Sequence, residues 1–302
     1  MKVFDLIIVG GGPAGITAGI YAVRKKMEFL MLTKDIGGQT LLTAGIENYT
    51  GYQFITGLEL VSKFREQMRD YREQVSEGEA ATSLKKEGDT VKIETAKGSY
   101  ETKTCIIASG KMPRKLGVSG EDKFKNKGVA YCATCDAPMF GGMDVAVVGG
   151  GNSGVDAVLQ LMKIAGRIHL IEASDNLGAD EVMAEKIEKS EKVVIRKNTK
   201  LEEIYGEDFV KGIKVFGGGR TQDIAVQGVF VEIGSLPSSD FVYGIAKNRI
   251  GEILVNCRSE TSIPGIFAAG DVTDVPAKQL IVACGEGAKA ALGAFNYLNR
   301  IK

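Results

Sequence analysis

Two cysteines and an acid lie close together in the stretch YCATCDAP, at Cys132, Cys135 and Asp136. Cysteines at this spacing form half of a zinc site, a structural disulfide or a redox pair. A zinc site needs four ligands, and the chain has one histidine, His169, and no second closely spaced cysteine pair. We therefore expect no metal, and the segments around the pair must decide between the other two.

The composition is that of a globular protein of about two domains. The chain has 302 residues, 44% of them hydrophobic, with 38 Lys and Arg against 38 Asp and Glu. This balance gives no reason to expect a nucleic-acid or membrane partner, and no apolar run reaches the roughly 18 residues of a membrane helix. Cys105, Cys257 and Cys284 are isolated, which suits core thiols in a reducing compartment. We expect a soluble, cytoplasmic protein.

One pattern typical of dinucleotide binding occurs twice, in FDLIIVGGGPAGITAGIYAVRKKMEFLML and in MDVAVVGGGNSGVDAVLQLMKIAGRIHLI. Each copy has an apolar run, GxGxxG, a helical pattern and a second apolar run. The first glycine makes a tight turn, the second lets backbone approach a pyrophosphate, and the third lets the helix pack closely. The phosphates then meet a helix N-terminus. The residues assigned to nucleotide binding are Gly10, Gly12, Pro13, Ala14, Gly15, Gly149, Gly151, Asn152, Ser153 and Gly154.

The residue that ends the second strand of each copy distinguishes the two sites. Glu172 lies 23 residues after Gly149, and Thr33 lies 23 residues after Gly10. A carboxylate at this place holds the ribose 2′-hydroxyl of a nicotinamide nucleotide, although a solvated charge at a strand end is the alternative for Glu172. Two dinucleotide sites favour one tightly held FAD and one exchanging nicotinamide.

Two later segments fit an FAD site. TCIIASG (104–110) and GIFAAGDV (265–272) are apolar runs that end in small residues. Asp271 follows the second run and is a candidate acceptor for the flavin ribitol, or else a turn or cap residue. The nicotinamide copy lies between these segments. We therefore predict an α/β fold of two doubly wound domains, the second inserted into the first, with an FAD-binding domain at 1–113 and 243–302 and an NAD(P)-binding domain at 114–242.

The whole chain resembles the low-molecular-weight thioredoxin reductases, through GGGPAG (10–15), GGQ (37–39), ENY (47–49), CATCD (132–136), GGGNSG (149–154) and GIFAAGD (265–271). From Gly128 onward it also resembles the flavoprotein component of alkyl hydroperoxide reductase. The resemblance implies a homodimer that reduces a thioredoxin- or glutaredoxin-like protein. It implies that Cys135 faces the flavin, that Cys132 attacks the partner, and that Asp136 is the acid–base group, unless it only caps the next turn.

The resemblance also assigns FAD contacts outside the first glycine turn. They are Thr33, Gly38, Gln39, Asn48, Ala108, Ser109, Gly110, Gly270, Asp271, Lys278 and Gln279. It further implies that the inserted domain rotates, so that the nicotinamide and the cysteine pair reach the flavin in turn. The segments at 110–117 and 236–244, which contain Pro and Gly, are the candidate hinges.

One departure from the family pattern bears on the electron donor. NADPH-using members end the second strand of the nicotinamide copy with His-Arg-Arg, whereas this chain has Glu172, Ala173 and Ser174, and no cation before Glu185. A 2′-phosphate beside Glu172 would place like charges together, so we predict NADH over NADPH. Ferredoxin or deazaflavin as donor, a role as peroxiredoxin reductase or NADH oxidase, and a non-catalytic nucleotide sensor remain the alternatives.

Two local predictions complete the sequence picture. His169 lies in the apolar run RIHLIEA, where a half-buried strand residue is expected. The segment at 62–79 alternates charge and predicts a solvated helix face.

Overall fold

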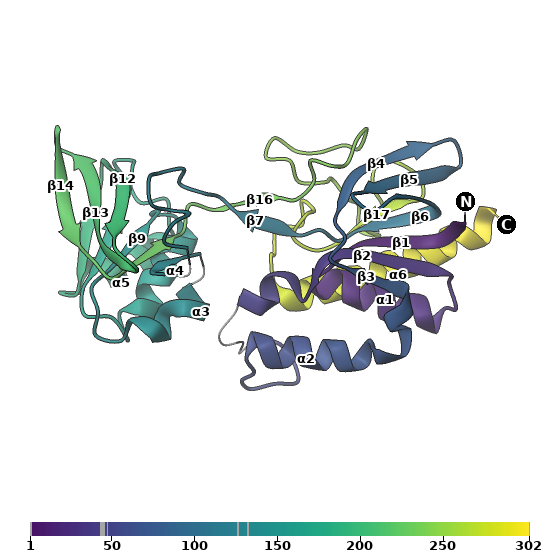
Figure 1. Ribbon diagram of the computed structural model, residues 1–302, viewed down its shortest axis with the longest axis horizontal. Helices are drawn as coiled ribbons and strands as arrows, with labels where there is room; N and C mark the ends of the chain where they lie inside the picture. Colours follow the sequence, from purple (N-terminus) through teal and green to yellow (C-terminus); the bar gives the residue numbers. More distant parts are fainter. Residues whose placement is uncertain (1, 43–45, 47, 126, 132, 302) are drawn as a thin grey trace. The chain divides into compact units, whose positions relative to one another are not determined.

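The chain separates into two compact units, which are described one at a time (Figure 1). A computed structural model describes residues 2–42, 46, 48–125, 127–131 and 133–301, with only the backbone at 42, 72, 134 and 135. Unit 1 comprises residues 1–112 and 236–302, and unit 2 comprises residues 113–235. The boundaries expected from the sequence fall after residues 113 and 242.

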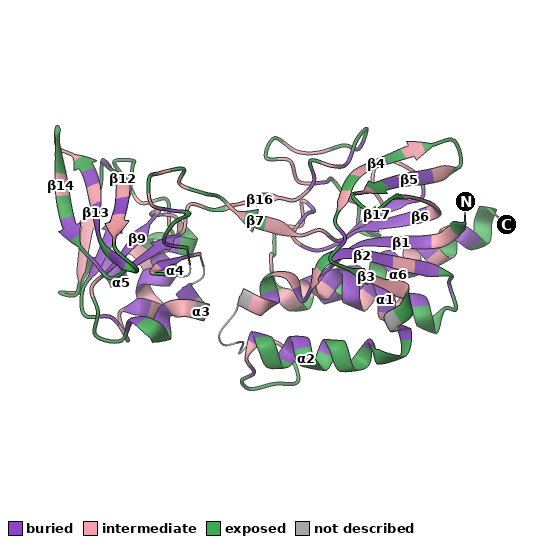
Figure 2. Cartoon of the chain, viewed as in Figure 1, coloured by how far each residue is buried: buried purple, intermediate pink, exposed green. Residues whose placement is uncertain are grey.

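Unit 1 is built on a mainly parallel sheet whose strand order is β3-β2-β1-β6-β5-β4. Its parallel strands are β1 (Val3–Gly11), β2 (Phe29–Ile36), β3 (Val75–Glu77), β6 (Ser99–Ile107) and β17 (Ile266–Ala268). The hairpin of β4 (Ala81–Glu87) and β5 (Thr90–Thr95) adds antiparallel pairs. β5 pairs with the start of β6 and β17 with its end. Figure 2 shows the central strands as the most buried part of the unit.

The central strands are buried on both faces, which explains their continuous apolar runs. Leu6 and Ile8 of β1 pack beneath α1 (Pro13–Arg24), α2 (Gly57–Gln67) and α6 (Leu280–Ile301). Ile7 and Val9 face a second cluster formed with the β4–β5 hairpin and residues 242–272. This packing places the turn between β1 and α1 at the carboxyl edge of the sheet, where doubly wound folds bind ligands.

The helix predicted over 62–79 is wrong beyond residue 67. α2 begins at a capping box in which Thr56 and Glu59 exchange hydrogen bonds, and it ends at Gln67. The chain then forms the 3-10 helix η2 (Arg69–Gln74) and enters β3, which pairs with β2 in parallel. A second 3-10 helix, η1, covers Gly38–Leu42.

Unit 2 is built on a parallel sheet of strand order β11-β10-β9-β15-β8. The strands are β8 (Val129–Ala130), β9 (Val145–Val148), β10 (Ile168–Ile171), β11 (Val193–Arg196) and β15 (Gly228–Val231). One face packs against α3 (Ala133–Asp136), the 3-10 helix η3 (Ala137–Phe140), α4 (Asn152–Leu161) and α5 (Glu181–Glu188). The other face packs against an antiparallel sheet of β12 (Thr199–Gly206), β13 (Val210–Gly217) and β14 (Arg220–Ala225). The predicted α/β class, with two doubly wound domains and the second inserted into the first, is confirmed.

The two chain connections between the units pair with each other. β7 (Lys111–Pro113) and β16 (Ser235–Pro237) form a two-stranded sheet.

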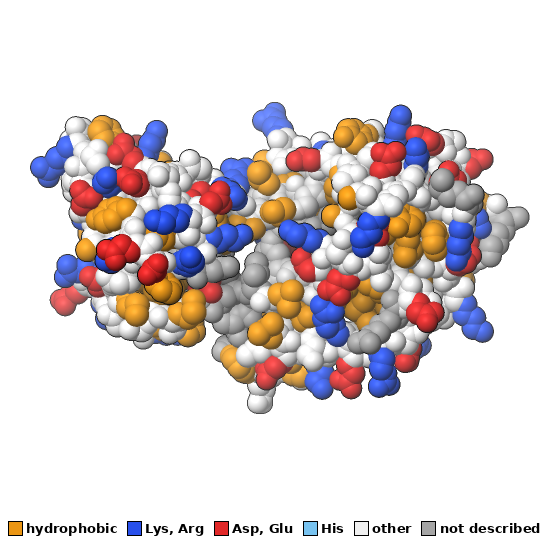
Figure 3. Space-filling view, in the orientation of Figure 1, with side chains coloured by type: hydrophobic (Ala, Val, Ile, Leu, Met, Phe, Trp, Pro, Cys, Tyr) orange, Lys and Arg blue, Asp and Glu red, His pale blue; other side chains and the backbone are white. Residues whose placement is uncertain are grey.

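Positive and negative side chains are intermingled over the face shown in Figure 3. In the described part of the chain, no helix combines the length and apolarity needed to cross a bilayer.

Candidate nucleotide and redox sites

Each glycine turn is closed at its first and third glycines and open at its second. A Cβ on Gly149, whose φ is +115°, would lie 2.3 Å from the Glu232 carbonyl oxygen, and one on Gly154 would lie 1.8 Å from that of Gly149. A Cβ on Gly151 would meet nothing within 4 Å. The middle glycine therefore presents bare backbone to open space, as a pyrophosphate requires.

The turn in unit 1 has the same geometry. A Cβ on Gly10, also at φ +115°, would lie 2.2 Å from the Ala108 carbonyl oxygen, one on Gly15 would lie 1.8 Å from that of Gly10, and one on Gly12 would meet nothing within 4 Å. Gly12 and Gly151 are the extended N-caps of α1 and α4, and neither helix has a side-chain cap. The first-turn N–H groups are thus open to an anion. Both turns fit a dinucleotide.

Glu172 lies against the glycine turn of unit 2. Its carboxylate accepts the backbone N–H of Gly150 at 2.5 Å and the backbone N–H and hydroxyl of Ser174 at 2.7 and 2.8 Å. Burial raises the pKa of Glu172, but these hydrogen bonds outweigh burial and hold the pKa below its usual range. Glu172 is therefore a charged acceptor beside the turn.

Thr33 takes the equivalent place in unit 1. Its hydroxyl donates to the Asp35 carbonyl at 2.6 Å, and a Cβ on Gly11 would lie 2.7 Å from that hydroxyl. A Cβ on Gly150 would lie 2.8 Å from Glu172 Oε2 in the same manner. The 23-residue offset thus puts matching positions beside the two turns, one neutral and one acidic. Gly38 also lies close to its turn, since a Cβ there would be 3.4 Å from the Gly12 Cα.

Hydrogen bonds in unit 1 join residues assigned to FAD to distant parts of the sequence. The Asn48 amide donates to the Gln279 side-chain oxygen at 3.1 Å, across 231 residues of chain. Gln39 donates to the backbone carbonyl of Lys111. Ser109 Oγ donates to the Ser238 carbonyl at 2.6 Å.

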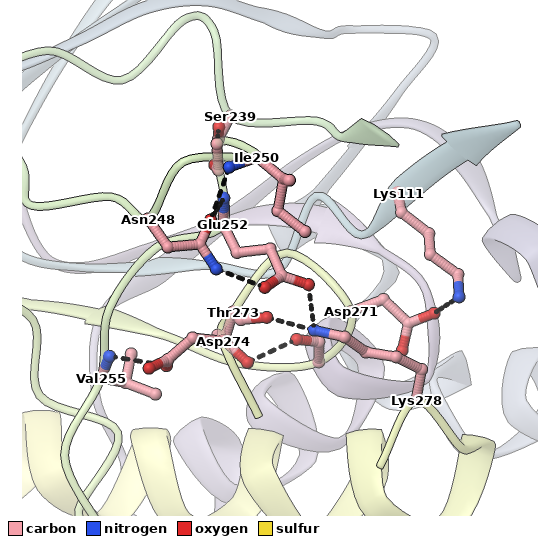
Figure 4. A network of polar contacts seen from close by, with 12 residues as sticks. Lys111, Ser239, Asn248, Ile250, Glu252, Val255, Asp271, Thr273, Asp274 and Lys278 are labelled. Atoms are coloured by element: carbon pink, nitrogen blue, oxygen red, sulfur yellow. Dashed lines mark hydrogen bonds and ion pairs between the residues drawn. The ribbon is translucent and has the colours of Figure 1, made fainter. Parts of the chain in front are cut away.

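Asp271 and Lys278 belong to a network of polar contacts at the end of β17 (Figure 4). Asp271 forms an ion pair with Lys111 at 3.4 Å. Lys278 pairs with Glu252 at 2.8 Å and donates to the Thr273 carbonyl. This network holds the segment between β17 and α6 in place and leaves Asp271 one quarter exposed.

Glu286 of α6 is a site residue that the sequence argument missed. It is 6% exposed and accepts the backbone N–H of Gly270 at 2.7 Å, while Gly270 itself has a φ of +77°. Burial raises the pKa of Glu286. The residue fixes the turn that carries Asp271. An acid seven residues past Gln279 in GEGAKA was visible in the sequence, but nothing in its spacing pointed to Gly270.

The predicted redox segment lies in unit 2. Cys132 lies outside the described residues, and Cys135 is described by its backbone alone, in α3. Asp136 is half-buried, burial raises its pKa, and its side chain does not cap η3. The capping role that was the alternative for Asp136 is therefore not seen at η3, and the raised pKa suits a group that holds a proton.

The other cysteines and the histidine divide between core and surface. Cys105 and Cys284 are buried, but Cys257 is exposed, so the expectation of a core thiol is wrong at that position. Cys257 lies in a turn outside the strands of unit 1. His169 is a strand residue of β10, as predicted, but it is buried, with 8% of it exposed, and not half-buried.

Comparison with known proteins places the chain in a family. Residues 4–287 match the pyridine nucleotide-disulphide oxidoreductase family, and the chain belongs to it. Membership implies an oxidoreductase class, with FAD and a nicotinamide nucleotide as cofactors. The fold is that of thioredoxin reductases: the Lactococcus lactis enzyme in its FR conformation matches 98% of this chain and 99% of its own, at 35% identity and a TM-score of 0.82.

Two sequence relatives carry other names. An "NADH dehydrogenase" of Ferdinandcohnia aciditolerans is 42% identical over 301 residues, which is 98% of this chain and 58% of the relative. A Staphylococcus aureus protein named as part of alkyl hydroperoxide reductase is 42% identical over 301 residues, which is 98% of this chain and 59% of the relative. The chain thus spans somewhat more than half the length of these relatives.

Proposed function

We propose that this chain is an FAD-dependent reductase that passes electrons from NADH through the Cys132–Cys135 pair to a disulfide on a thioredoxin- or glutaredoxin-like protein. The observation that carries the proposal is the presence of two open glycine turns in one chain, with the cysteine pair in the same unit as the turn that has the acidic partner. Unit 1 would hold the FAD, and unit 2 the nicotinamide nucleotide. Bound FAD would supply a two-electron relay between nicotinamide and disulfide.

The residues of the chain divide the remaining work. Gly12 and the N-terminus of α1 would bind the FAD pyrophosphate, Asp271 the ribitol, and Asn48 with Gln279 the ring edge. The Cys132 thiolate would attack the partner disulfide, forming a mixed disulfide, and the Cys135 thiolate would release the reduced partner. Asp136 would hold the proton that the leaving thiol needs.

The charge of Glu172 supports the preference for NADH. A carboxylate held ionised by three donors accepts a ribose 2′-hydroxyl and repels a 2′-phosphate. We expect kcat/KM for NADH to exceed that for NADPH by at least about tenfold, which corresponds to ~1.4 kcal/mol. Glu172→Gln should narrow the ratio of the two kcat/KM values, mainly by raising kcat/KM for NADPH. Equal values for the two donors in the parent protein would contradict the assignment.

A second candidate function comes from the relatives named for alkyl hydroperoxide reductase and NADH dehydrogenase. The same dithiol could serve a peroxiredoxin-linked partner, or the flavin could reduce oxygen directly. Cys135→Ser separates these routes, because it should abolish disulfide reduction but leave direct oxidation of NADH. We also propose that the protein is a homodimer in the cytoplasm. We further propose that unit 2 rotates between two half-reactions, the reduction of the flavin by the nicotinamide and the reduction of the cysteine pair by the flavin.

Anaerobic titration of the FAD-bound protein tests the core of the proposal. NADH should bleach the flavin absorbance, and the cysteine pair should take up about two further electrons. In the Cys135→Ser variant this additional uptake should be absent. NADPH and reduced ferredoxin, titrated separately, identify the donor. A folded protein that takes up no flavin, or a flavin that NADH leaves oxidised while ferredoxin reduces it, would overturn the assignment.

A further inference from the structure

Lys111, the first residue of β7, contacts two residues assigned to FAD that come from distant parts of the chain. Its backbone carbonyl accepts a hydrogen bond from the side chain of Gln39, which belongs to η1. Its ammonium group forms an ion pair with Asp271 at 3.4 Å, and Figure 4 shows the Lys111 side chain extending from β7 to that carboxylate. The sequence argument placed Lys111 only in a candidate hinge. The structure instead shows it in contact with two proposed flavin-binding residues.

Lys111 balances the charge of Asp271. Among the described residues, it is the only cation within ion-pair distance of that carboxylate. Lys278, which belongs to the same polar network, pairs instead with Glu252 at 2.8 Å. FAD is an anion through its pyrophosphate. Without Lys111, an uncompensated carboxylate would therefore lie at the proposed ribitol contact and repel the ligand.

The pair between Lys111 and Asp271 differs from an ordinary surface ion pair. Exposed pairs contribute little to stability, because two long side chains must be ordered and water screens their charges. Here the two side chains are only 28% and 25% exposed. The backbone of Lys111 is held by Gln39 and by the pairing of β7 with β16. We therefore expect a weaker screening of the two charges and a smaller loss of conformational entropy than at an open surface.

We propose that Lys111 is a positioning residue of the FAD site, which aligns Gln39 through its backbone carbonyl and neutralises Asp271 through its ammonium group. This inference rests on the proposed function, in which unit 1 holds the FAD. The ammonium group orients the carboxylate as an acceptor for a ribitol hydroxyl and lowers the electrostatic cost of an anionic ligand beside it. Because the side chain acts through Asp271, its effect on FAD binding depends on the charge of Asp271.

The test measures FAD affinity in the full chain and needs no turnover. The FAD-bound protein is dialysed to equilibrium against a series of FAD concentrations, and the flavin retained per chain gives Kd. Lys111→Met removes the charge but keeps the backbone carbonyl that Gln39 contacts, and it should raise Kd about fivefold or more. Lys111→Gln should behave in the same way. Lys111→Arg keeps a cation and should return Kd close to the parent value.

Two further readouts separate the charge of Lys111 from its packing. In an Asp271→Asn background, Lys111→Met should change Kd by less than about twofold, because the carboxylate that Lys111 neutralises is gone. In the chain that keeps Asp271, raising the salt concentration from about 0.1 M to about 1 M should narrow the difference in Kd between Lys111→Met and the parent, because the Debye length falls from about 10 Å to about 3 Å. A contribution from packing alone would be the same in both backgrounds and at both salt concentrations.

Lys103→Met is the matched control. Lys103 of β6 pairs with Asp5 of β1 at 2.9 Å, and the Asp5 side chain is 24% exposed, close to the 25% of Asp271. This pair also belongs to unit 1, but neither of its residues is assigned to a cofactor. Lys103→Met should therefore bind FAD as the parent does.

Three results would overturn the inference. One is a Lys111→Met protein that binds FAD as tightly as the parent or more tightly. The others are a loss of affinity that persists in the Asp271→Asn background and a loss that high salt leaves unchanged. Failure of the proposed function looks different, since it appears as a parent chain that retains no FAD or as a bound flavin that NADH does not reduce, whichever residue stands at position 111.

Discussion

At the scale of single residues, the glycines of each turn have two separate tasks. Gly10 is confined by the Ala108 carbonyl and by its φ of +115°, so any side chain there is strained. Gly12 has free space in front of it and is needed only for what binds there. Stability and ligand binding are therefore assigned to different members of one motif.

This division predicts opposite outcomes for two alanine substitutions. Gly12→Ala should leave the free energy of unfolding of the apoprotein within about 0.5 kcal/mol of the parent value but reduce FAD retention strongly. Gly10→Ala should lower the free energy of unfolding by about 3 kcal/mol, through strain and the clash with Ala108. Urea unfolding and the ratio of flavin to protein absorbance measure both. A Gly12→Ala protein with full flavin content would contradict the prediction.

The residue scale also shows how far sequence reasoning reaches. The place of Glu172 beside its turn follows from a fixed offset, because one strand and one helix of ordinary length lie between. The hydrogen bond between Asn48 and Gln279 joins positions 231 residues apart, so no local sequence pattern predicts it. Only the family resemblance assigned both residues to the FAD site. Glu286 was missed for the same reason, because its partner, Gly270, comes from another element.

At the scale of elements, a buried acid joins three strands of unit 1. Glu79 follows β3, is 3% exposed, and accepts hydroxyl donors from Thr95 of β5 at 2.6 Å and Tyr100 of β6 at 2.8 Å. Ser76 of β3 donates to the same carboxylate. Burial raises the pKa of Glu79, but these hydrogen bonds outweigh burial and hold the pKa below its ordinary value of 4.5.

This network predicts a pH-dependent contribution to stability. A carboxyl whose folded-state pKa is depressed stabilises the fold above its unfolded pKa and loses that contribution as pH falls through the folded value. At pH 7, Glu79→Gln should therefore lower the free energy of unfolding by about 1–3 kcal/mol, and the gap should narrow below pH 4.5. Urea unfolding of the parent and of the variant at several pH values measures this difference in the free energy of unfolding. Glu66→Gln, on the exposed face of α2, is the control and should change little; a gap independent of pH would refute the charge argument.

Elements were predicted well where their periodicity was long and poorly where it was short. The two strand–turn–helix units carry continuous apolar runs and a glycine signature, so their class and order were clear. The charged segment at 62–79 was assigned to one helix, yet it holds the end of α2, the 3-10 helix η2 and the whole of the edge strand β3. A three-residue strand such as β3 gives no usable alternation, and its place is set by pairing with β2.

At the scale of the whole molecule, unit 2 is one continuous stretch of chain with its own core on both faces of its sheet. We expect residues 113–235 expressed alone to unfold in one cooperative transition and to bind NADH. Circular dichroism and NADH fluorescence measure these properties, and Gly151→Ala should abolish binding without moving the transition. A fragment that lacks cooperative unfolding would show that the unit depends on the rest of the chain.

The pairing of β7 with β16 has a consequence for engineering. Because the outgoing and returning chains are neighbouring strands, unit 1 ends in two points only about 5 Å apart. At such a junction, a short Gly-Ser linker can join the two ends of unit 1 directly, or a different domain with adjacent termini can be inserted between them. Chimaeras made at Met112 and Leu236 would exchange the nucleotide specificity of the inserted module while the flavin-binding scaffold stayed the same.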